Sequence, residues 1–137
     1  MQTFLPYKDF KKSAECLDYK RLGKQRCEAW QILQCLLGEG SLSWKNHPAV
    51  KMWKGHEVFL CIYGMAVCCE WINRGYKDTM LKRFENELKK LELCPYPEWI
   101  NLSFCKRHQS NLLRKNPKYY SKFKWDVPDN LEYIWPI

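Results

Sequence analysis

Apolar residues recur at three- and four-residue steps over much of the chain, which is the pattern of amphipathic helices packed on a core. The pattern predicts a first helix over about 13–37 that stops at the glycine-rich residues 38–40. Gly23 lies inside this predicted helix, where glycine is unfavourable by roughly 1 kcal/mol relative to alanine. It therefore marks either a close approach by another backbone or a break in the helix.

A second helix is predicted from His56 or Glu57 to about Arg74, with Gly75 as the residue that ends it. Its interior is apolar nearly all round rather than along one stripe. A helix of this kind is normally covered on every side, so we expect it to be the central buried helix.

Two further helices and three irregular segments complete the pattern. The third helix follows a cap at Asp78 or Thr79 and runs to about Leu91, and the fourth covers about 98–115. The irregular segments are an extended N-terminal arm (1–10, turning at Pro6), a loop (38–55) and an aromatic-rich C-terminal tail (116–137). No strand-like alternation occurs, so the sequence predicts an all-α fold, a compact bundle of about four helices in one domain spanning 1–137.

The charge balance points to an anionic partner. The 137 residues carry a formal net charge of +8, which favours nucleic acid over a membrane surface, although many proteins with a pI near 9 bind no polyanion. Seven Trp, eight Tyr and six Phe are present, and many of them lie beside Lys or Arg. Such pairs suit unpaired nucleic acid, because aromatic faces stack on bases while the cations hold phosphates.

Eight cysteines are present without a single CxxC pair, and most lie in apolar helical contexts. A reduced cysteine there packs as a small hydrophobic side chain. Cys94, Cys105 and His108 form a loose group without the spacing of a familiar zinc module, so neither metal nor cofactor is expected. The first ten residues lack the apolar run of a signal peptide, and the longest uncharged stretch is too short to cross a bilayer. We therefore expect an intracellular protein in a reducing compartment.

Three polar clusters, at 18–28, 46–56 and 108–115, interrupt the apolar pattern. In the first, cationic and amide side chains share one helix face with a carboxylate, Glu28. One interpretation is an exposed ion pair worth a few tenths of a kcal/mol. The other is a carboxylate kept ionised by cations that also bind phosphate, able to stabilise positive charge on a sugar or to transfer protons.

The three histidines are each more typical of structural roles when taken singly. His47 precedes a proline, His56 stands at a predicted helix start, and His108 has polar neighbours in the fourth helix. Their occurrence within the three polar clusters favours one shared site. The chain has no Gly-rich phosphate loop, HExxH or GxSxG motif, which disfavours nucleoside triphosphatases, zinc peptidases and α/β hydrolases.

Several segments resemble the phage-type pyrimidine-dimer DNA glycosylases, the repair-type endonuclease V family. Residues 53–76 are similar to its central helix, which a Gly-His pair opens and an Arg-Gly-aromatic sequence closes. Residues 108–123 are similar to its final helix and aromatic, basic C-terminal segment, and residues 19–26 to its Arg-rich catalytic helix. Residues 3–7 and 20–26 also resemble a bacterial branch to which the same activity is assigned by similarity.

The resemblance implies an all-α domain whose N-terminal α-amine attacks the sugar C1′ of a damaged nucleotide. An imine forms, the base leaves, and β-elimination can then nick the strand. An α-amine has a pKa near ~8, so it is partly uncharged at neutral pH, unlike an ordinary lysine. In this scheme a first-helix carboxylate stabilises the developing cation, arginines bind phosphates of the kinked strand, and a base is flipped out.

The chain departs from the family pattern at two catalytic positions. The family nucleophile is a small residue exposed after removal of Met, whereas Met1 is followed here by Gln2, whose size generally blocks that removal. The expected nucleophile is therefore the Met1 amine. The family's Arg-Glu pair is also absent, and Glu28 is the expected substitute for its carboxylate, with Asp18 in reserve.

The leading hypothesis is a monomeric DNA glycosylase, with or without AP lyase activity, that removes a damaged or modified pyrimidine from double-stranded DNA. The alternatives are a nucleic-acid-binding module that has lost the chemistry and an enzyme that processes a free nucleotide or another N-glycoside. The expected catalytic residues are Met1, Glu28 and Arg21. The expected nucleic-acid-binding residues are Lys20, Lys24, Arg26, His47, His56, His108, Arg114, Lys115, Tyr119, Tyr120, Phe123 and Trp125.

Overall fold

Helices make up the regular structure of this chain. The structure, a computed structural model, describes residues 1–40 and 42–137, and about 60% of the chain is helical with no strand in these ranges. The all-α prediction is confirmed, but the described residues form seven α-helices and two short 3-10 helices rather than about four helices. They are α1 (Phe10–Cys16), α2 (Tyr19–Leu36), η1 (Leu42–Trp44), α3 (Pro48–Trp53), α4 (Glu57–Asn73), α5 (Leu81–Lys90), α6 (Leu102–Lys115), α7 (Pro117–Tyr120) and η2 (Ser121–Phe123).

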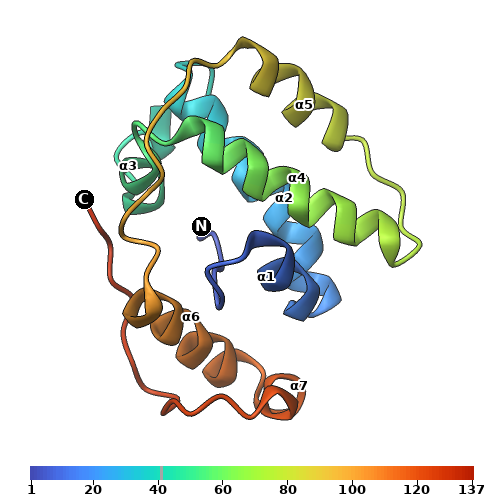
Figure 1. The fold of residues 1–137 in the computed structure, drawn as a ribbon, viewed down its shortest axis with the longest axis vertical. Helices are drawn as coiled ribbons and strands as arrows, with labels where there is room; N and C mark the ends of the chain where they lie inside the picture. Colours follow the sequence, from blue (N-terminus) through green and yellow to red (C-terminus); the bar gives the residue numbers. More distant parts are fainter. Residues whose placement is uncertain (41) are drawn as a thin grey trace.

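The second predicted helix is α4, and it lies at the centre as expected. It packs against α1, α2 and α5, and α2 and α4 overlap in the middle of Figure 1. Gly75 follows its C-cap with φ +93°, a left-handed conformation that glycine adopts without strain. Gly64 has a packing role, because a Cβ atom there would lie 2.4 Å from the Phe84 ring. The absence of a side chain thus lets α5 approach α4 closely.

The predicted single helix over 13–37 is wrong, because the chain breaks between α1 and α2. Leu17 is extended and buried, and Asp18 caps α2 by accepting a hydrogen bond from the Arg21 backbone N–H at 3.4 Å. The Tyr120 hydroxyl donates to the Asp18 carboxylate and accepts from its backbone N–H at 3.0 Å. A partner 102 residues away thus fixes the break, and helical periodicity carries no sign of it.

Gly23 neither breaks α2 nor admits another backbone. The helix continues through it, and a Cβ atom there would lie 2.9 Å from the indole ring of Trp71. The glycine therefore makes room for an aromatic side chain of α4, which fixes how closely the two helices pack.

The predicted loop over 38–55 contains two short helices, η1 and α3, while Ser41 lies outside the described residues. Pro48 occupies the first position of α3, where its missing N–H is tolerated, and His47 caps the helix. Trp53 at the end of α3 is fully buried. The proline thus starts a helix rather than marking a loop.

The C-terminal elements start later than predicted or are more regular than predicted. The N-cap residue of α5 is Met80 rather than Asp78 or Thr79, but Asp78 accepts hydrogen bonds from the backbone of Met80 and Leu81, at 3.1 and 2.7 Å, at the start of this helix. Asn101 caps α6, which therefore begins at Leu102 rather than near residue 98. The tail forms α7 and η2 before it becomes irregular beyond residue 123.

The N-terminal arm lies inside the molecule. Residues 1–9 contain no helix, and the chain bends over 6–9, in keeping with the predicted turn at Pro6. Residues 2–5 are nonetheless buried. Figure 1 shows the N-terminus inside the fold, between α1 and α2 on one side and α6 on the other.

Several thiols pack into the core. Cys61, Cys68 and Cys105 are buried, and burial raises the pKa of Cys61 to about 12 and that of Cys105 to about 11. Cys27 and Cys69 are exposed instead. Within the described ranges, no helix is long and apolar enough to cross a membrane.

Candidate active site

Side chains of α2 hold the backbone of the buried N-terminal segment. Glu28 Oε2 accepts a hydrogen bond from the Gln2 backbone N–H at 2.7 Å. Gln25 Nε2 donates to the Gln2 carbonyl at 2.8 Å, and its Oε1 accepts from the Phe4 N–H at 2.9 Å. Because residues 25 and 28 are one turn apart, both side chains leave the same face of α2. They satisfy backbone groups that would otherwise be buried without partners.

Three further side chains anchor the same segment from other elements. The Tyr63 hydroxyl lies 2.6 Å from Gln25 Oε1 and 2.9 Å from the Phe4 carbonyl, so it can donate to either. Trp53 Nε1 donates to the Thr3 hydroxyl at 3.0 Å. His108 Nδ1 accepts from the Leu5 N–H at 2.9 Å. Contacts from α2, α3, α4 and α6 therefore converge on four consecutive residues of the arm.

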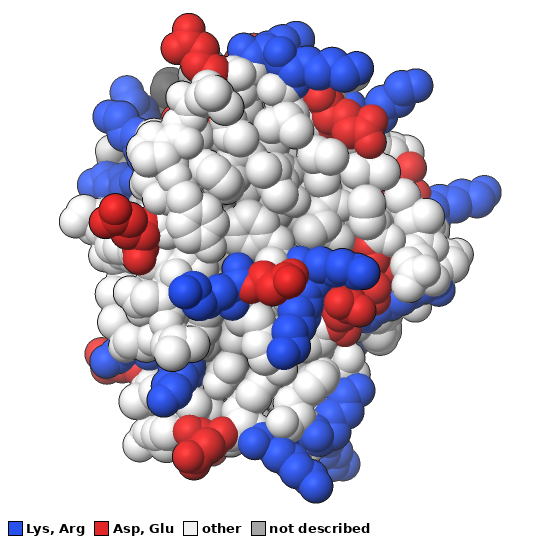
Figure 2. All heavy atoms as spheres, viewed as in Figure 1, with Lys and Arg blue, Asp and Glu red and all other residues white. Residues whose placement is uncertain are grey.

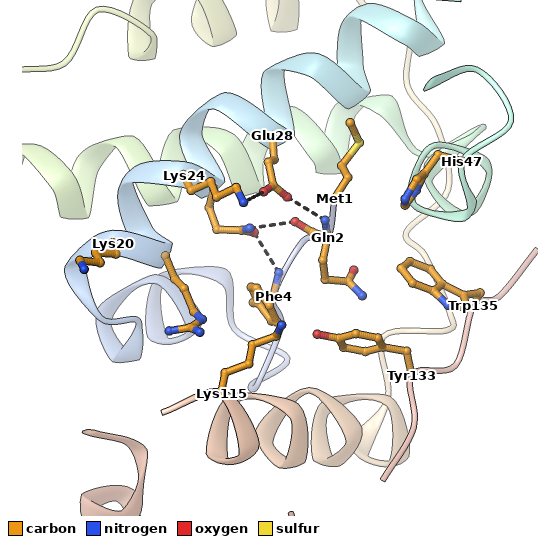
Figure 3. A pocket seen from close by; sticks show the side chains of 12 residues that line it. Met1, Gln2, Phe4, Lys20, Lys24, Glu28, His47, Lys115, Tyr133 and Trp135 are labelled. Carbon is orange, nitrogen blue, oxygen red and sulfur yellow. Dashed lines mark hydrogen bonds and ion pairs between the residues drawn. The ribbon is translucent and has the colours of Figure 1, made fainter. Parts of the chain in front are cut away.

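The first residues of the arm line a pocket of about 540 Å³, which Figure 3 shows from close by. Its described lining residues include four cations but a single carboxylate, Glu28. The lining residues are Met1, Gln2, Phe4, Lys20, Arg21, Lys24, Gln25, Glu28, His47, Lys115, Tyr133 and Trp135. A pocket with this charge balance suits an anionic ligand that carries or develops one centre of positive charge.

Glu28 is fixed beside the beginning of the chain. Its side chain is 11% exposed, and Oε1 lies 3.6 Å from Lys24 Nζ while Oε2 binds the Gln2 N–H. The Met1 nitrogen is three covalent bonds from the Gln2 nitrogen, so it lies within about 7 Å of Oε2. The predicted nucleophile and the predicted carboxylate therefore line one pocket, while their catalytic roles remain predictions.

Asp18, the reserve carboxylate, is occupied by its capping role. It does not line the pocket, and it pairs with Arg21 Nη1 at 3.2 Å as well as with Tyr120. Burial works against its ionisation, but hydrogen bonds from Tyr120 and Arg21 lower the pKa of the Asp18 carboxyl below its usual value. Arg21 is half-buried and also borders the pocket, so it links the cap of α2 to the site.

His47 reaches the pocket from the start of α3. Its Nδ1 accepts a hydrogen bond from the Ala49 N–H at 3.0 Å, which places a ring proton on Nε2. Burial lowers the pKa of His47, and the nearby Met1 amine lowers it further, against an opposing effect of Glu28. We therefore expect a neutral imidazole at neutral pH. Its ring packs edge-on against Trp135 at 5.9 Å.

Four of the predicted nucleic-acid-binding side chains lie away from the pocket and hold the fold. Arg26 pairs with Asp78 and stacks over Trp71 at 4.6 Å. His56 Nδ1 lies 2.8 Å from the Pro95 carbonyl, and Arg114 donates to the Asp129 carbonyl at 2.9 Å. His108 is fully buried beneath the arm. For these side chains the structure gives an intramolecular partner instead of a place in the pocket.

The aromatic residues predicted to press on DNA form a cluster around α7. Tyr120 is fully buried and bonded to Asp18, so it is inaccessible to a ligand. The rings of Phe123 and Trp125 stack with centroids 5.1 Å apart, and Trp125 Nε1 donates to the Tyr7 hydroxyl at 2.9 Å. Tyr119 packs on Tyr120 at 4.8 Å. DNA contact by the three partly exposed rings stays a prediction, and their present contacts attach the tail.

Sequence reasoning missed five residues of the pocket. Gln25 is an amide on the polar face of α2 that carries Glu28, and Gln2 is the neighbour of Met1, so local signals existed for both. Phe4 carried no signal of this kind. The local sequence around Tyr133 and Trp135 also gave no signal, because hydrogen bonds between α6 and the tail bring these two residues to the pocket. In one of these, Ser110 Oγ accepts from the Leu131 N–H at 2.9 Å.

The molecular surface around the site carries charges of both signs. On the face in Figure 2, Lys and Arg side chains cross the middle and lower part, with Asp and Glu between them. The case for phosphate binding therefore depends on the cations that converge on the pocket, Lys20, Arg21, Lys24 and Lys115, rather than on a uniform basic face. Among the described residues, no group of three or more His, Cys, Asp or Glu could hold a metal ion.

The profile of the family described as pyrimidine dimer DNA glycosylase matches residues 1–84, which is more than half of the chain. The chain belongs to this family. No curated protein and no solved structure matches it. The region shared with the pyrimidine dimer DNA glycosylases contains the arm, α2 and His47, whereas Lys115, Tyr133 and Trp135 lie beyond it.

The buried His108 should make the stability of this family member depend on pH. Burial lowers its pKa to about 3, whereas an unfolded histidine takes up its proton near pH 6.5. Between these values the unfolded state binds more protons, so stability is present above pH 6.5 and lost as the pH falls. We expect the free energy of unfolding in urea to fall by about 2 kcal/mol between pH 6.5 and 5 from this group.

A His108→Asn variant supplies the control. Its amide oxygen can still accept from the Leu5 N–H but does not titrate, so its stability should depend less on pH in that window. Equal slopes for the two proteins would show that His108 is not the group responsible.

Proposed function

We propose that this protein is a DNA glycosylase with AP lyase activity that acts on a damaged or modified pyrimidine through the α-amine of a retained Met1. The observation that carries the proposal is the hydrogen bond from the Gln2 N–H to Glu28, which sets the start of the chain beside the only carboxylate among the described pocket residues. Membership of a family of pyrimidine dimer DNA glycosylases supports the same chemistry.

The first step replaces a carbon–nitrogen bond of the nucleotide by one to the protein. The lone pair of the Met1 nitrogen attacks C1′, and the bond between C1′ and the base breaks with its electron pair leaving on the base. The attacking nitrogen then loses a proton to Glu28, the only carboxylate among the described pocket residues. When C1′–O4′ breaks, O4′ takes up the proton that Glu28 had accepted, so that the carboxylate is ionised again and an imine joins Met1 to the opened sugar.

The second step uses the acidity of the imine. Loss of a C2′ proton to Glu28 and departure of the 3′ phosphate give β-elimination, which nicks the strand. Glu28 suits both transfers because it is held by two different partners and still borders the pocket. The positive charge of the protonated imine is stabilised by the same carboxylate.

The pocket and its cations set how DNA is engaged. A volume of about 540 Å³ suits a single nucleotide better than an intact base pair, so we expect one nucleotide to leave the duplex. Lys20, Arg21 and Lys24 from α2 and Lys115 from α6 line the pocket, which supports a role for them in binding the flanking phosphates.

Borohydride trapping on duplex DNA with one abasic site tests the proposal. Borohydride reduces an imine to a stable amine, so the wild-type protein should become covalently joined to the DNA. The matched variant carries Gly-Ser ahead of Met1, which moves the α-amine by up to about 7 Å. We expect it to lose at least about 90% of the trapped product, because effective attack needs reacting atoms roughly 3 Å apart.

Equal trapping of the two proteins would contradict the role of Met1. Binding that weakens steeply with salt, without any trapped product, would indicate a nucleic-acid-binding module that lacks the chemistry. Release of base from a free nucleotide, but not from duplex DNA, would instead indicate the N-glycoside-processing alternative.

Glu28→Gln should separate rate from binding. The amide oxygen can still accept from the Gln2 N–H, but the negative charge is lost. We expect the single-turnover cleavage rate on abasic duplex to fall about 100-fold or more, while affinity changes little. Glu39→Gln, at an exposed position beyond α2, is the control and should cleave at the wild-type rate. A Glu28→Gln rate equal to wild type would remove this carboxylate from the mechanism.

A further inference from the structure

The side chain of Gln2 leaves a buried donor facing the pocket. Its Oε1 accepts a hydrogen bond from the Thr3 N–H at 2.8 Å, whereas its Nε2 has no partner among the described residues. Gln2 is only 6% exposed and lines the pocket. Figure 3 shows its carboxamide directed towards Tyr133 and Trp135.

An unpaired buried amide donor is unfavourable by about 1–3 kcal/mol, so its persistence calls for a partner. The hydrogen bond to Thr3 fixes the side chain, so Nε2 cannot swing out to solvent without breaking that bond. A ligand with an acceptor atom would satisfy Nε2 inside the pocket. Gln2 is thus held ready to donate one hydrogen bond to whatever enters.

The pocket wall on this side is aromatic. Tyr133 and Trp135 come from the C-terminal tail, with ring centroids 5.6 Å apart, and His47 packs edge-on against Trp135. The cations lie on the other walls, which are formed by α2 and α6. The pocket is therefore divided between groups that suit phosphate and groups that suit a flat, uncharged ring.

Several hydrogen bonds between α6 and the tail keep the aromatic wall in place. Asn111 Nδ2 donates to the Leu131 carbonyl at 3.2 Å, and Arg114 Nη1 donates to the same carbonyl at 3.3 Å. Arg107 Nη1 donates to the Glu132 carbonyl at 2.9 Å. Tyr133 follows Glu132 directly in the sequence. Its position is therefore fixed by the backbone of Leu131 and Glu132, which side chains of α6 hold.

We infer that the Gln2 carboxamide, together with Tyr133 and Trp135, forms a subsite that binds the target pyrimidine through its O2 carbonyl oxygen. This inference rests on the proposed function. O2 is bonded to the ring carbon next to N1, the atom that joins the base to C1′. A nucleotide placed with C1′ at the Met1 amine therefore presents O2 close to the side chain of the following residue, Gln2.

The same contact assists departure of the base. When C1′–N1 breaks, the bonding electron pair stays with the pyrimidine, and the negative charge spreads from N1 onto O2. The Gln2 Nε2–H donates to O2, so its hydrogen bond strengthens as that charge develops.

The test compares two duplexes of the same sequence, one with a cyclobutane thymine dimer and one with an abasic site. Only the first contains a base for Gln2 to bind. Gln2→Met removes the donor and keeps a large second residue, so Met1 should be retained, which intact mass spectrometry checks. We expect the single-turnover rate on the dimer duplex to fall about 100-fold more than the rate on the abasic duplex.

A second variant guards against disturbance of the arm. Gln2→Glu keeps an oxygen that can accept from the Thr3 N–H, but a carboxylate oxygen replaces the Nε2 donor. This variant should therefore also lose more of the rate on the dimer duplex than of the rate on the abasic duplex. Trp135→Leu should also lower the dimer rate more than the abasic rate, while Ile134→Ala, an exposed neighbour, serves as its control.

Equal losses on the two duplexes, or no loss on either, would overturn the base subsite. So would a wild-type protein that cleaves the abasic duplex but leaves the dimer intact, although the amine chemistry would then survive. Failure of the wild-type protein to be trapped on the abasic duplex would overturn the proposed function instead.

Discussion

The hydrogen bond from the Gln2 N–H to the Glu28 carboxylate is the contact on which the site depends. A nearly buried carboxylate is unfavourable unless it is hydrogen-bonded or paired, and here the backbone of the arm and Lys24 supply both partners. The arm in turn has no neighbouring strand among the described residues, so its polar backbone needs side-chain partners such as Gln25. Each requirement is met by the other, and the beginning of the chain is thereby fixed against α2.

This arrangement joins the stability of the fold to the geometry of the site. Tyr63, Trp53 and His108 are buried side chains from three different helices, and each holds one point of the arm. A change in any of them would act on the position of Met1 without touching a ligand. The cations of the pocket differ in this respect, because the side chains of Lys20 and Lys115 are exposed and can adapt to phosphates.

Local sequence signals predicted the helices better than they predicted the contacts between them. The apolar pattern located α4 and the residues that end it, and the charged face of α2 drew attention to Glu28. The break at Asp18 escaped prediction because Tyr120, far along the chain, stabilises it. Tyr133 escaped for a similar reason, since hydrogen bonds from α6 to the tail place it in the pocket. Conversely, Arg26 shares a helix with the site residues but faces Asp78 and Trp71.

The most direct test of the account is to find which nitrogen attaches to DNA. The borohydride-reduced adduct with abasic DNA can be digested and its attachment point located by tandem mass spectrometry. The account predicts that the sugar remnant is on the α-nitrogen of Met1. A remnant on the ε-nitrogen of Lys24, Lys20 or Lys115, the other amines that line the pocket, would contradict it.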